Sequence, residues 1–464
     1  MNKVNVVILS AISSLALHAA EINQVIVRQQ WPWSTDVKIE YVLSGVTKPV
    51  DITVKAYDGD VELSQWAVDA ALSGDRYGLT SEGVGTITLD PVKAFGGSKV
   101  MMTNFKVKLS VADSPDNLDE VLYKVFSLTN SHEQVVELTR RDLLNGKYGS
   151  VVTDYGAIGS GFQTSLSDVL IWTGVTNSIK YKTTHLVMRK IPAKEYGIWT
   201  FGSPTTEYSR QTVQWEPPED QHTVKLTENF YIGVFELTQA QYANVMSRVD
   251  TQLSAWPSSY TADDRDVHPV EQVSYQTLRS QYYVWPDQDP MHKIHTSNSL
   301  FLRPLRNWTG VEFDLPTSAQ WEFACRAGTT TALSDGREYT SETQKAHTLE
   351  LAWLGVNADT TMEVGLLKPN AYGLYDMQGN VSEFCVDLTA DNIDVDGTGD
   401  PVVDPKGGKT GSTTSRVIRG GAFSNASGLG VLTCARSAFR YSRQENVNPN
   451  WVGCRVVCPE NATW

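Results

Sequence analysis

The first part of the chain, residues 21–113, consists of short segments in which apolar and polar residues alternate. Alternation with a period of two is the pattern of a strand with one buried face. Turn residues such as Ser44-Gly45 separate the segments. Short alternating strands at this spacing predict an all-β sandwich, and because the region has no cysteine pair, the fibronectin-like version is expected rather than the immunoglobulin version. The clearest segments are Val37–Leu43, Val50–Ala56, Thr86–Leu89 and Phe105–Val111.

Residues 114–183 show weaker patterns and are interpreted as a connecting region. Ser114-Pro-Asp-Asn117 marks the exit from the sandwich with turn-forming residues. Tyr123–Leu128 is typical of a strand, and Glu133–Leu143 predicts a short helix. We assign no chemical role to this region.

The remaining residues, 184–464, mix the signals of strands and helices. His185–Ile191 predicts a strand. Two helices are expected to begin with capping boxes, one formed by Thr238 and Gln241 and the other by Thr317 and Gln320. Such a mixture, with much irregular chain between the elements, predicts the α+β class for this part.

The N-terminus, residues 1–20, has a pattern of its own. Lys3, an apolar run from Val4 to Leu17 and small residues after it are typical of a secretory signal peptide. The alternative is a buried N-terminal strand or helix, but a different kind of sequence begins at Glu21. No later segment has about eighteen consecutive apolar residues, so no membrane span is expected. The protein is therefore predicted to be exported to the periplasm, the cell surface or the medium.

Length and charge limit the classes of partner. At 464 residues the chain is long enough for about two or three domains. It has 53 Asp and Glu against 39 Lys and Arg, which gives a net charge of −14. A protein this acidic repels nucleic acid and anionic membranes, so neither is expected as a partner.

One stretch, Tyr372–Asp387, combines turn residues with apolar ones and carries two acids. Its dipeptide Gly379-Asn380 tolerates positive φ, and Asp376 and Glu383 flank this turn. Two carboxylates with backbone carbonyl groups between them can bind a hard cation such as Ca²⁺. The alternative is a buried turn whose acids cap backbone N–H groups, and the spacing alone favours this alternative.

The same stretch resembles the Gly-Leu-Tyr-Asn/Asp-Met-x-Gly-Asn-Val-x-Glu-Trp signature of the formylglycine-generating enzyme (sulfatase-modifying factor) family, with Phe384 in place of the usual Trp. Further blocks follow in the family's order, so the resemblance extends from about Thr184 to the C-terminus. It implies a variant of the C-type-lectin fold for residues 184–464. That fold serves both oxidases and pure binding proteins, so it does not settle function. The further blocks are Phe230–Tyr242, His268–Ser274, Leu315–Gly328, Arg416–Gly421 and Gly453–Val457.

The resemblance also implies a calcium site in the central stretch. Its ligands would be the side chains of Asp376 and Glu383 and the carbonyl groups of Gly379 and Val381. Asp376 keeps the oxygen of the Asn found in other members and adds a charge. A second calcium site of the family depends on a longer segment than Trp353–Lys368 and is not expected here.

Oxidising members of the family bind Cu(I) through two cysteines that follow an Arg-Gly-Gly-Ser-Phe block, because thiolates are soft ligands. The corresponding segment, Ser424–Thr433, contains no cysteine. The two positions fall on Asn425 and Gly430 or, counted back from the C-terminal block, on Ser427 and Leu432. Neither pair supplies a thiolate, so copper is not expected.

The five cysteines all lie in the family-like part, and an exported protein meets conditions that permit disulfides. The resemblance implies a bond from Cys325 to the final strand of the domain. Cys458 is the predicted partner and Cys454 the alternative. Because five is an odd number, at least one thiol has no partner within the chain.

Two arginines, Arg436 and Arg440, have apolar neighbours in the sequence. We predict that they are buried in structural ion pairs with Glu322, Glu383 or Asp387. This role is favoured over substrate binding.

Two interpretations of function follow. The first is an exported, non-catalytic binding module for a protein, peptide or glycan, because residues 424–433 and 441–451 are rich in the Ser, Asn, Gly and Tyr of adaptable recognition surfaces. The second is a formylglycine-generating-type oxidoreductase, or a family enzyme with altered chemistry. The ligand-binding surface expected under the first interpretation consists of Ser424, Asn425, Ser427, Tyr441 and Trp451.

Overall fold

The structure is a computed structural model whose chain forms two compact units, described here one at a time. The first unit comprises Met1–Leu122, Leu138–Ala157 and Trp172–Val175, and the second comprises Tyr123–Glu137, Ile158–Ile171 and Thr176–Trp464. No described helix is long and apolar enough to cross a membrane. The structure describes residues 20–29, 34–63, 65–95, 104–130, 133, 135–153, 169–210, 219–249, 253–279, 300–338, 345–389, 401–405, 414–424 and 431–461.

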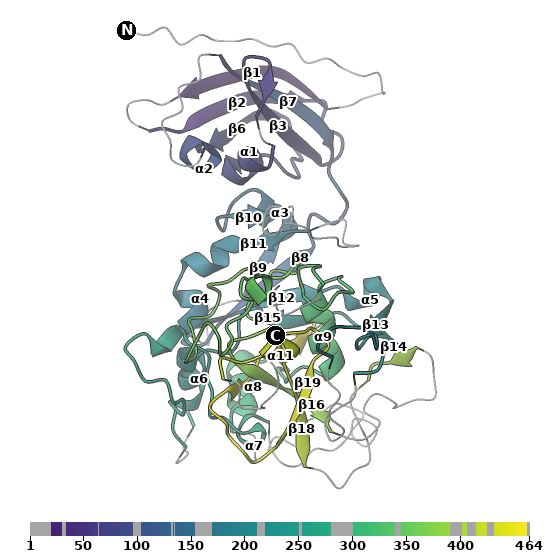
Figure 1. Ribbon diagram of the computed structural model, residues 1–464. Coiled ribbons are helices and arrows are strands. Elements are labelled where there is room, and N and C mark those ends of the chain that lie inside the picture. Colours follow the sequence, from purple (N-terminus) through teal and green to yellow (C-terminus); the bar gives the residue numbers. More distant parts are fainter. Residues whose placement is uncertain are drawn as a thin grey trace. The chain divides into compact units, whose positions relative to one another are not determined.

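The first unit is built on two sheets, with strand orders β1-β2-β6-β5 and β4-β3-β7 (Figure 1). Every second residue of β2 and β3 is buried, because successive side chains of a strand point to opposite faces. The buried rows pack into one apolar cluster, so the predicted sandwich is confirmed; two short helices are added to it. The elements are β1 Glu21–Gln29, β2 Val37–Ser44, β3 Val50–Asp58, β4 Val61–Glu62, α1 Gln65–Ala71, β5 Leu72–Gly74, β6 Gly83–Leu89, α2 Pro91–Phe95 and β7 Phe105–Asp113.

The segment between residues 114 and 183 contributes to both units. The helix predicted over Glu133–Leu143 is wrong in its central part, because Val136–Thr139 forms strand β9 at the edge of a sheet. Thr139 then caps a shorter helix, α3, by accepting a hydrogen bond from the Asp142 N–H. The elements are β8 Val121–Ser127, β9 Val136–Thr139, α3 Arg140–Leu144, β10 Val151–Val152, β11 Ile171–Trp172 and the 3₁₀ helix η2 Thr173–Asn177.

The described residues of the second unit form three sheets, with strand orders β21-β15-β12-β8-β9, β13-β14-β17 and β19-β18-β16-β20. With its helices it confirms the predicted α+β class, and β12 occupies the residues predicted for a strand. The strands are β12 His185–Ile191, β13 Ile198–Phe201, β14 His222–Lys225, β15 Phe230–Gly233, β16 Ser382–Leu388, β17 Val402–Val403, β18 Ser415–Arg419, β19 Arg440–Gln444, β20 Val452–Gly453 and β21 Val457–Pro459.

Both predicted capping boxes are present in the second unit. Thr238 and Gln241 close the N-terminus of α6, and Thr317 and Gln320 close that of α9. The helices are α4 Lys180–Thr183, α5 Ala193–Tyr196, α6 Gln239–Met246, the 3₁₀ helix η3 Arg265–Val267, α7 Tyr275–Leu278, α8 Leu302–Thr309, α9 Ser318–Arg326, α10 Lys345–Thr348 and α11 Val431–Cys434.

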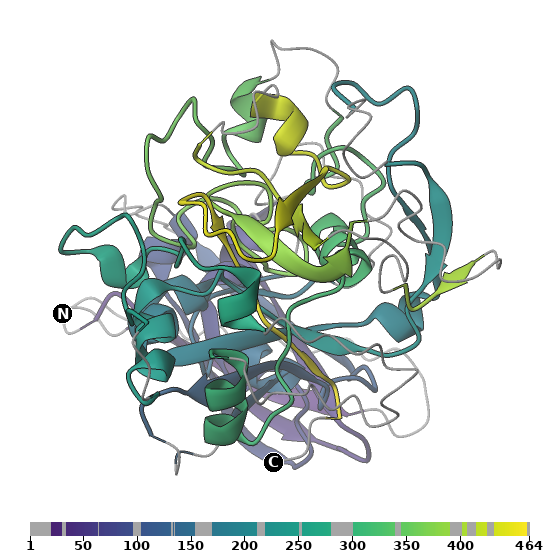
Figure 2. The same ribbon diagram turned by 90° about the horizontal axis from the view of Figure 1, so that it is seen from below.

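The four-stranded sheet brings the central stretch and the C-terminal blocks together. Strand β16 pairs antiparallel with β18 and parallel with β20, and β18 pairs antiparallel with β19. Figure 2 shows these green-to-yellow strands side by side in the second unit. Every functional residue predicted from the sequence and described by the structure lies in this sheet or in the segments that pack against it, except Cys458 on β21.

Candidate functional site

The central stretch forms a buried turn that leads into β16. Asp376 and Asn380 adopt positive φ angles of 60° and 69°, which short polar side chains tolerate. Gly379 is needed for a different reason, because a Cβ at this position would lie 2.6 Å from the carbonyl oxygen of Trp353. Cβ contacts under 3.0 Å are essentially never found, so a larger residue would push the turn away from Trp353.

The buried acid Glu236 holds this turn from the N-terminal side of α6. Its carboxylate accepts hydrogen bonds from the Asn380 side-chain amide at 2.7 Å and from the Val381 N–H at 3.0 Å. Burial raises the pKa of Glu236 well above its ordinary value, and the charges of Asp376 and Glu383 raise it further. Sequence reasoning did not select Glu236 as a site residue, although it lies in one of the blocks that carry the family resemblance.

Asp376 is only partly satisfied. Its Oδ2 accepts a hydrogen bond from the Gly365 N–H at 2.7 Å, while its Oδ1 has no hydrogen-bond partner among the described residues. Burial raises the pKa of Asp376 to about 6, in spite of the nearby cations Arg455 and Lys182. An unpartnered carboxylate oxygen in the interior is costly, so this atom is a candidate ligand for a cation.

Glu383, by contrast, is fully engaged by protein groups. Both of its oxygens bond Arg455, with an Oε1–Nη2 distance of 2.9 Å, and Oε2 also accepts a hydrogen bond from Trp321 Nε1 at 2.8 Å. Arg455 is buried and donates its other N–H groups to the carbonyl oxygens of Gly233 and Tyr375. The predicted calcium ligand Glu383 therefore has a structural ion-pair role, but with Arg455 rather than with Arg436 or Arg440.

The predicted calcium set can be compared with these contacts. No group of three or more His, Cys, Asp or Glu side chains among the described residues is arranged to hold a metal ion. The predicted set, however, uses only two carboxylates and relies on the carbonyl groups of Gly379 and Val381. Of the two carboxylates, Asp376 has an oxygen to offer, whereas the lone pairs of Glu383 are used by Arg455 and Trp321.

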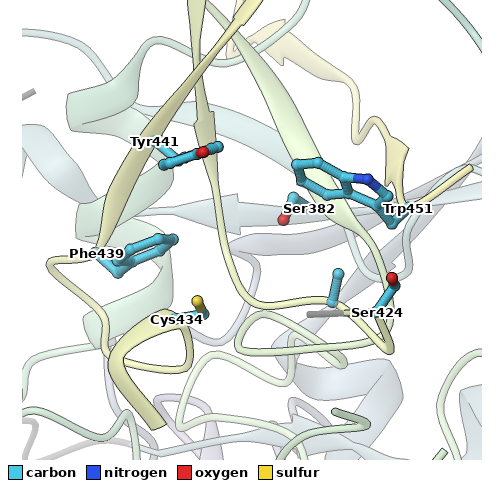
Figure 3. A pocket seen from close by; sticks show the side chains of 7 residues that line it. Ser382, Ser424, Cys434, Phe439, Tyr441 and Trp451 are labelled. Atoms are coloured by element: carbon cyan, nitrogen blue, oxygen red, sulfur yellow. The ribbon is translucent and has the colours of Figure 1, made fainter. Parts of the chain in front are cut away.

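A small hollow lies beside β19, at the sheet that contains β16. Three of the predicted surface residues, Ser424, Tyr441 and Trp451, line it, and Figure 3 shows these side chains facing one another across it. Its cavity volume is about 20 Å³, which is room for about one water molecule. The other predicted surface residues, Asn425 and Ser427, lie outside the described residues. The remaining lining residues are Ser382, Ala422, Cys434 and Phe439.

All five cysteines are thiols rather than disulfides. The predicted bond between Cys325 and Cys458 is not formed, and neither is the alternative with Cys454. Cys325 lies on the buried face of α9, where its Sγ is 3.6 Å from Ser437 Oγ, whereas Cys458 lies on β21 opposite Tyr231. The two cysteines thus contact different residues. Burial raises the pKa of each thiol to about 12.

Arg436 is buried and binds two carboxylates. Its Nη1 lies 2.6 Å from Glu207 Oε1, and both of its Nη atoms bond Glu219 at 2.7 and 2.8 Å. These partners differ from the predicted ones, because they precede Arg436 by 229 and 217 positions and only the fold brings them near it.

Arg440 is also buried, with its guanidinium 5.0 Å from the centre of the Phe201 ring. Of the partners predicted for the two arginines, Glu322 binds Arg419 and Arg326. Glu383 binds Arg455, as described above. The arginine-carboxylate pairs of this region are therefore more numerous than the sequence indicated. The partners predicted for Arg436 are wrong, and the partner of Arg440 stays a prediction.

Comparison with known proteins gives several curated relatives of part of the chain, of which three are described here. A chaperone protein LppX of Paenibacillus barcinonensis is 29% identical over 186 residues, which cover 34% of this chain and 61% of the relative. A formylglycine-generating enzyme of Thermomonospora curvata is 36% identical over 126 residues, covering 25% of this chain and 39% of the relative. The formylglycine-generating enzyme of Mus musculus is 25% identical over 267 residues, covering 51% of this chain and 66% of the relative. The chain thus spans 39 to 66% of the length of these relatives.

Two solved structures are similar to part of the chain. PvdO from Pseudomonas aeruginosa is 22% identical with a TM-score of 0.43, and the match covers 59% of this chain and 94% of PvdO. Treponema denticola variable protein 1 is 25% identical with a TM-score of 0.39, covering 60% of this chain and 96% of that protein. The sulfatase-modifying factor enzyme 1-like domain matches residues 195–459. This match takes in more than half of the 464 residues, and the chain belongs to that family.

Proposed function

We propose that this protein is an exported binding protein whose family domain recognises a protein, peptide or glycan without oxidising cysteine. The observation that carries the proposal is the thiol content of the hollow beside β19. Cys434 is the only cysteine among the described residues that line it. Residues 425–430, which the structure does not describe, contain no cysteine in the sequence.

One thiol is too few for the copper chemistry of the oxidising relatives. A Cu(I) ion held by soft ligands needs a pair of thiolates, as the resemblance implies. Cys385 could supply the second thiolate only if it reached the hollow. It is buried in β16, and burial and the charge of Asp387 raise the pKa of its thiol well above the ordinary value. This environment opposes formation of the thiolate.

The competing function is cysteine oxidation. The observation that favours it is the thiol of Cys434, which lines the hollow together with Ser382 and Ser424. The test uses the reduced full chain, loaded with Cu(I) and offered a Cys-x-Pro-x-Arg peptide. We expect no aldehyde product and no oxygen consumption above that of the Cys434→Ser variant. Tight equimolar copper binding with an aldehyde product that Cys434→Ser abolishes would falsify the binding role.

The binding role makes its own prediction. A screen of glycans and peptides against the full chain should find a ligand whose affinity falls when Tyr441 is changed to Ala. Tyr208→Ala is the matched control, because Tyr208 is an exposed tyrosine of the same unit that does not line the hollow. Equal loss of affinity in both variants would show that the ligand binds elsewhere.

We also propose that the central turn binds Ca²⁺. The buried Oδ1 of Asp376, which has no hydrogen-bond partner among the described residues, supports this proposal, because a bound cation would satisfy it. Asp376 and the carbonyl groups of Gly379 and Val381 would hold the ion, which would stabilise the turn and take no part in a reaction.

The calcium proposal is tested by thermal unfolding of the full chain with and without a calcium chelator. We expect the chelator to lower the Tm of the native chain and to leave that of Asp376→Ala, which has no side-chain oxygen to offer the ion, unchanged. An unchanged Tm in the native chain would mean that the stretch is only a turn.

A further inference from the structure

Arg443 lies between two aromatic rings that line the hollow. On β19, Tyr441 and Arg443 are two residues apart and share one face of the sheet. The Arg443 guanidinium carbon is 4.2 Å from the centre of the Tyr441 ring and 4.4 Å from that of Trp451. The two ring centres are 6.5 Å apart and the rings are tilted by 50°, so the guanidinium lies in the angle between them and contacts both. These contacts restrict its motion, so little further entropy is lost when it binds a ligand.

Arg443 has no carboxylate partner among the described residues. Its cross-strand neighbour Arg416 differs, because Arg416 Nη2 bonds Glu445 Oε2 at 3.1 Å. The one hydrogen bond that the structure gives the Arg443 side chain joins Nη1 to the Ser442 carbonyl oxygen at 2.8 Å. A guanidinium has five N–H donors, so most of those on Arg443 remain for a ligand.

The geometry of the hollow favours a peptide over a glycan. Trp451 is only 8% exposed and Arg443 covers one of its faces, so little indole surface is left on which a sugar could stack. The hollow has room for about one water molecule, so a ligand would lie across its mouth. Among the described residues β19 pairs only with β18, and an extended peptide can add to the open edge of such a strand.

Resting on the binding role proposed above, we propose that the ligand is an acidic peptide segment and that Arg443 determines this specificity. The peptide lies extended along β19, and the carboxylate of a Glu or Asp side chain accepts hydrogen bonds from the remaining N–H groups of Arg443. Charge-assisted bonds of this kind are about twice as strong as neutral ones and select a planar acceptor. Arg443 is half-buried, so solvent screens the contact less than it would on an open surface.

The probes are two pools of short peptides with blocked termini, identical except for Glu or Gln at the central position. Blocking removes the terminal carboxylate, so the pools differ only in the side-chain charge. We expect the full chain to bind the Glu pool about tenfold more tightly, a difference of about 1.4 kcal/mol. Arg443→Gln should remove this preference, and Arg443→Lys should keep part of it, because Lys retains the charge but not the planar fork.

Arg265→Gln is the matched control. Arg265 also lies over an aromatic ring, with its guanidinium carbon 4.2 Å from the centre of Trp256, but Trp256, unlike Tyr441 and Trp451, does not line the hollow. This variant should keep the preference for Glu. Circular dichroism and Tm of all three variants separate a loss of specificity from a loss of fold.

Three results would overturn the inference. They are equal binding of the two pools, a preference for Glu that survives in Arg443→Gln, and binding of uronate oligosaccharides with no binding of either peptide pool. Each of them leaves the broader binding role in place if some ligand is still found. Aldehyde formation in the copper experiment is a different readout and contradicts the binding role itself.

Discussion

The two units of the protein hold their cores by different interactions. The core of the first unit consists of apolar side chains from alternating strand positions, and ion pairs such as Lys55–Glu62 lie on its surface. The second unit has an apolar core too, but it also buries arginine-carboxylate pairs, among them Arg419–Glu322 and Arg455–Glu383. The difference follows from the secondary structure. Paired strands of a sandwich hydrogen-bond the N–H and C=O groups of one another's backbones, whereas irregular segments leave many of these groups without a backbone partner.

The buried arginines supply the hydrogen bonds that irregular chain lacks. Arg326 donates to the carbonyl oxygens of Gly202 and Thr331, and Arg419 Nη1 donates to the carbonyl oxygens of residues 437–439. Both arginines bond the same carboxylate, that of Glu322, because an unpaired buried charge would cost several kcal/mol. Buried charge is thus part of how this family domain organises its loops, whereas the half-buried Arg443 has no acid partner among the described residues.

The largest expected effect comes from breaking such a network. Glu322 bonds Arg326 and Arg419 at 2.8 Å each and accepts a hydrogen bond from the Gly202 N–H at 2.9 Å. Glu322→Ala leaves two buried arginines without their carboxylate, so we expect the second unit to lose about 3–5 kcal/mol. Hydrogen exchange followed by mass spectrometry measures the loss in each unit.

The control for that variant is Glu62→Ala in the first unit, where the ion pair with Lys55 is exposed. Exposed pairs contribute little because water screens them. No measurable change is expected from Glu62→Ala. Comparable losses in the two variants would remove the distinction between the units.

The second prediction tests whether residues after the sandwich belong to the first unit. The Asn145 side chain, at the C-terminus of α3, accepts hydrogen bonds from the N–H groups of Arg76 and Tyr77 at 3.2 and 3.1 Å. Asn145→Ala leaves these donors without their acceptor, so we expect the first unit to lose about 1–3 kcal/mol. Faster exchange should appear in residues 72–89. If those residues exchange at the native rate, α3 is not part of the unit's cooperative structure.

The third prediction concerns the apolar core of the first unit. Ile39 is fully buried on β2, and Ile39→Val removes one methylene group. We expect a loss of about 0.5–1.5 kcal/mol, confined to the first unit. Urea unfolding gives the value, and Val84→Ala is the control because Val84 is 75% exposed. An equal effect of the two substitutions would contradict the assignment of Ile39 to the core.

The smallest expected effect distinguishes the units by pH. His268 is buried against Tyr260, with its ring 4.0 Å from the tyrosine ring, and burial lowers the pKa of His268 below its ordinary value of 6.5. As the pH falls below about 6.5, the imidazole of His268 therefore takes up a proton in the unfolded chain before it does so in the folded chain. The second unit should lose stability there by at most about 1.4 kcal/mol per pH unit.

His268→Gln should flatten this part of the pH profile. The first unit contains no histidine after His18, so no such dependence on a histidine is expected in its described residues. Hydrogen exchange between pH 5 and pH 7, corrected for the intrinsic rate, compares the two units on one sample. A slope that persists in His268→Gln would assign the effect to another group.

The parts of the fold that could be predicted depend on neighbours in the sequence. The strands β2 and β3 follow from alternation, and the capping boxes at Thr238 and Thr317 each need a partner only three residues away. The helix expected over Glu133–Leu143 failed because β9 pairs with a strand that local patterns do not specify. The family resemblance located the central stretch but not the contacts of its side chains.

The sequence by itself determined the alternating strands of the first unit, the two capping boxes and the family of the second unit. Tertiary structure alone decided which charges meet. In the folded chain Glu383 pairs with Arg455, and Oδ1 of Asp376 has no hydrogen-bond partner among the described residues. The guanidinium of Arg443 contacts the rings of Tyr441 and Trp451. The reason is physical: periodicity and capping depend on residues within a turn or two, whereas an ion pair in the interior depends on which distant segments the fold brings to the same place.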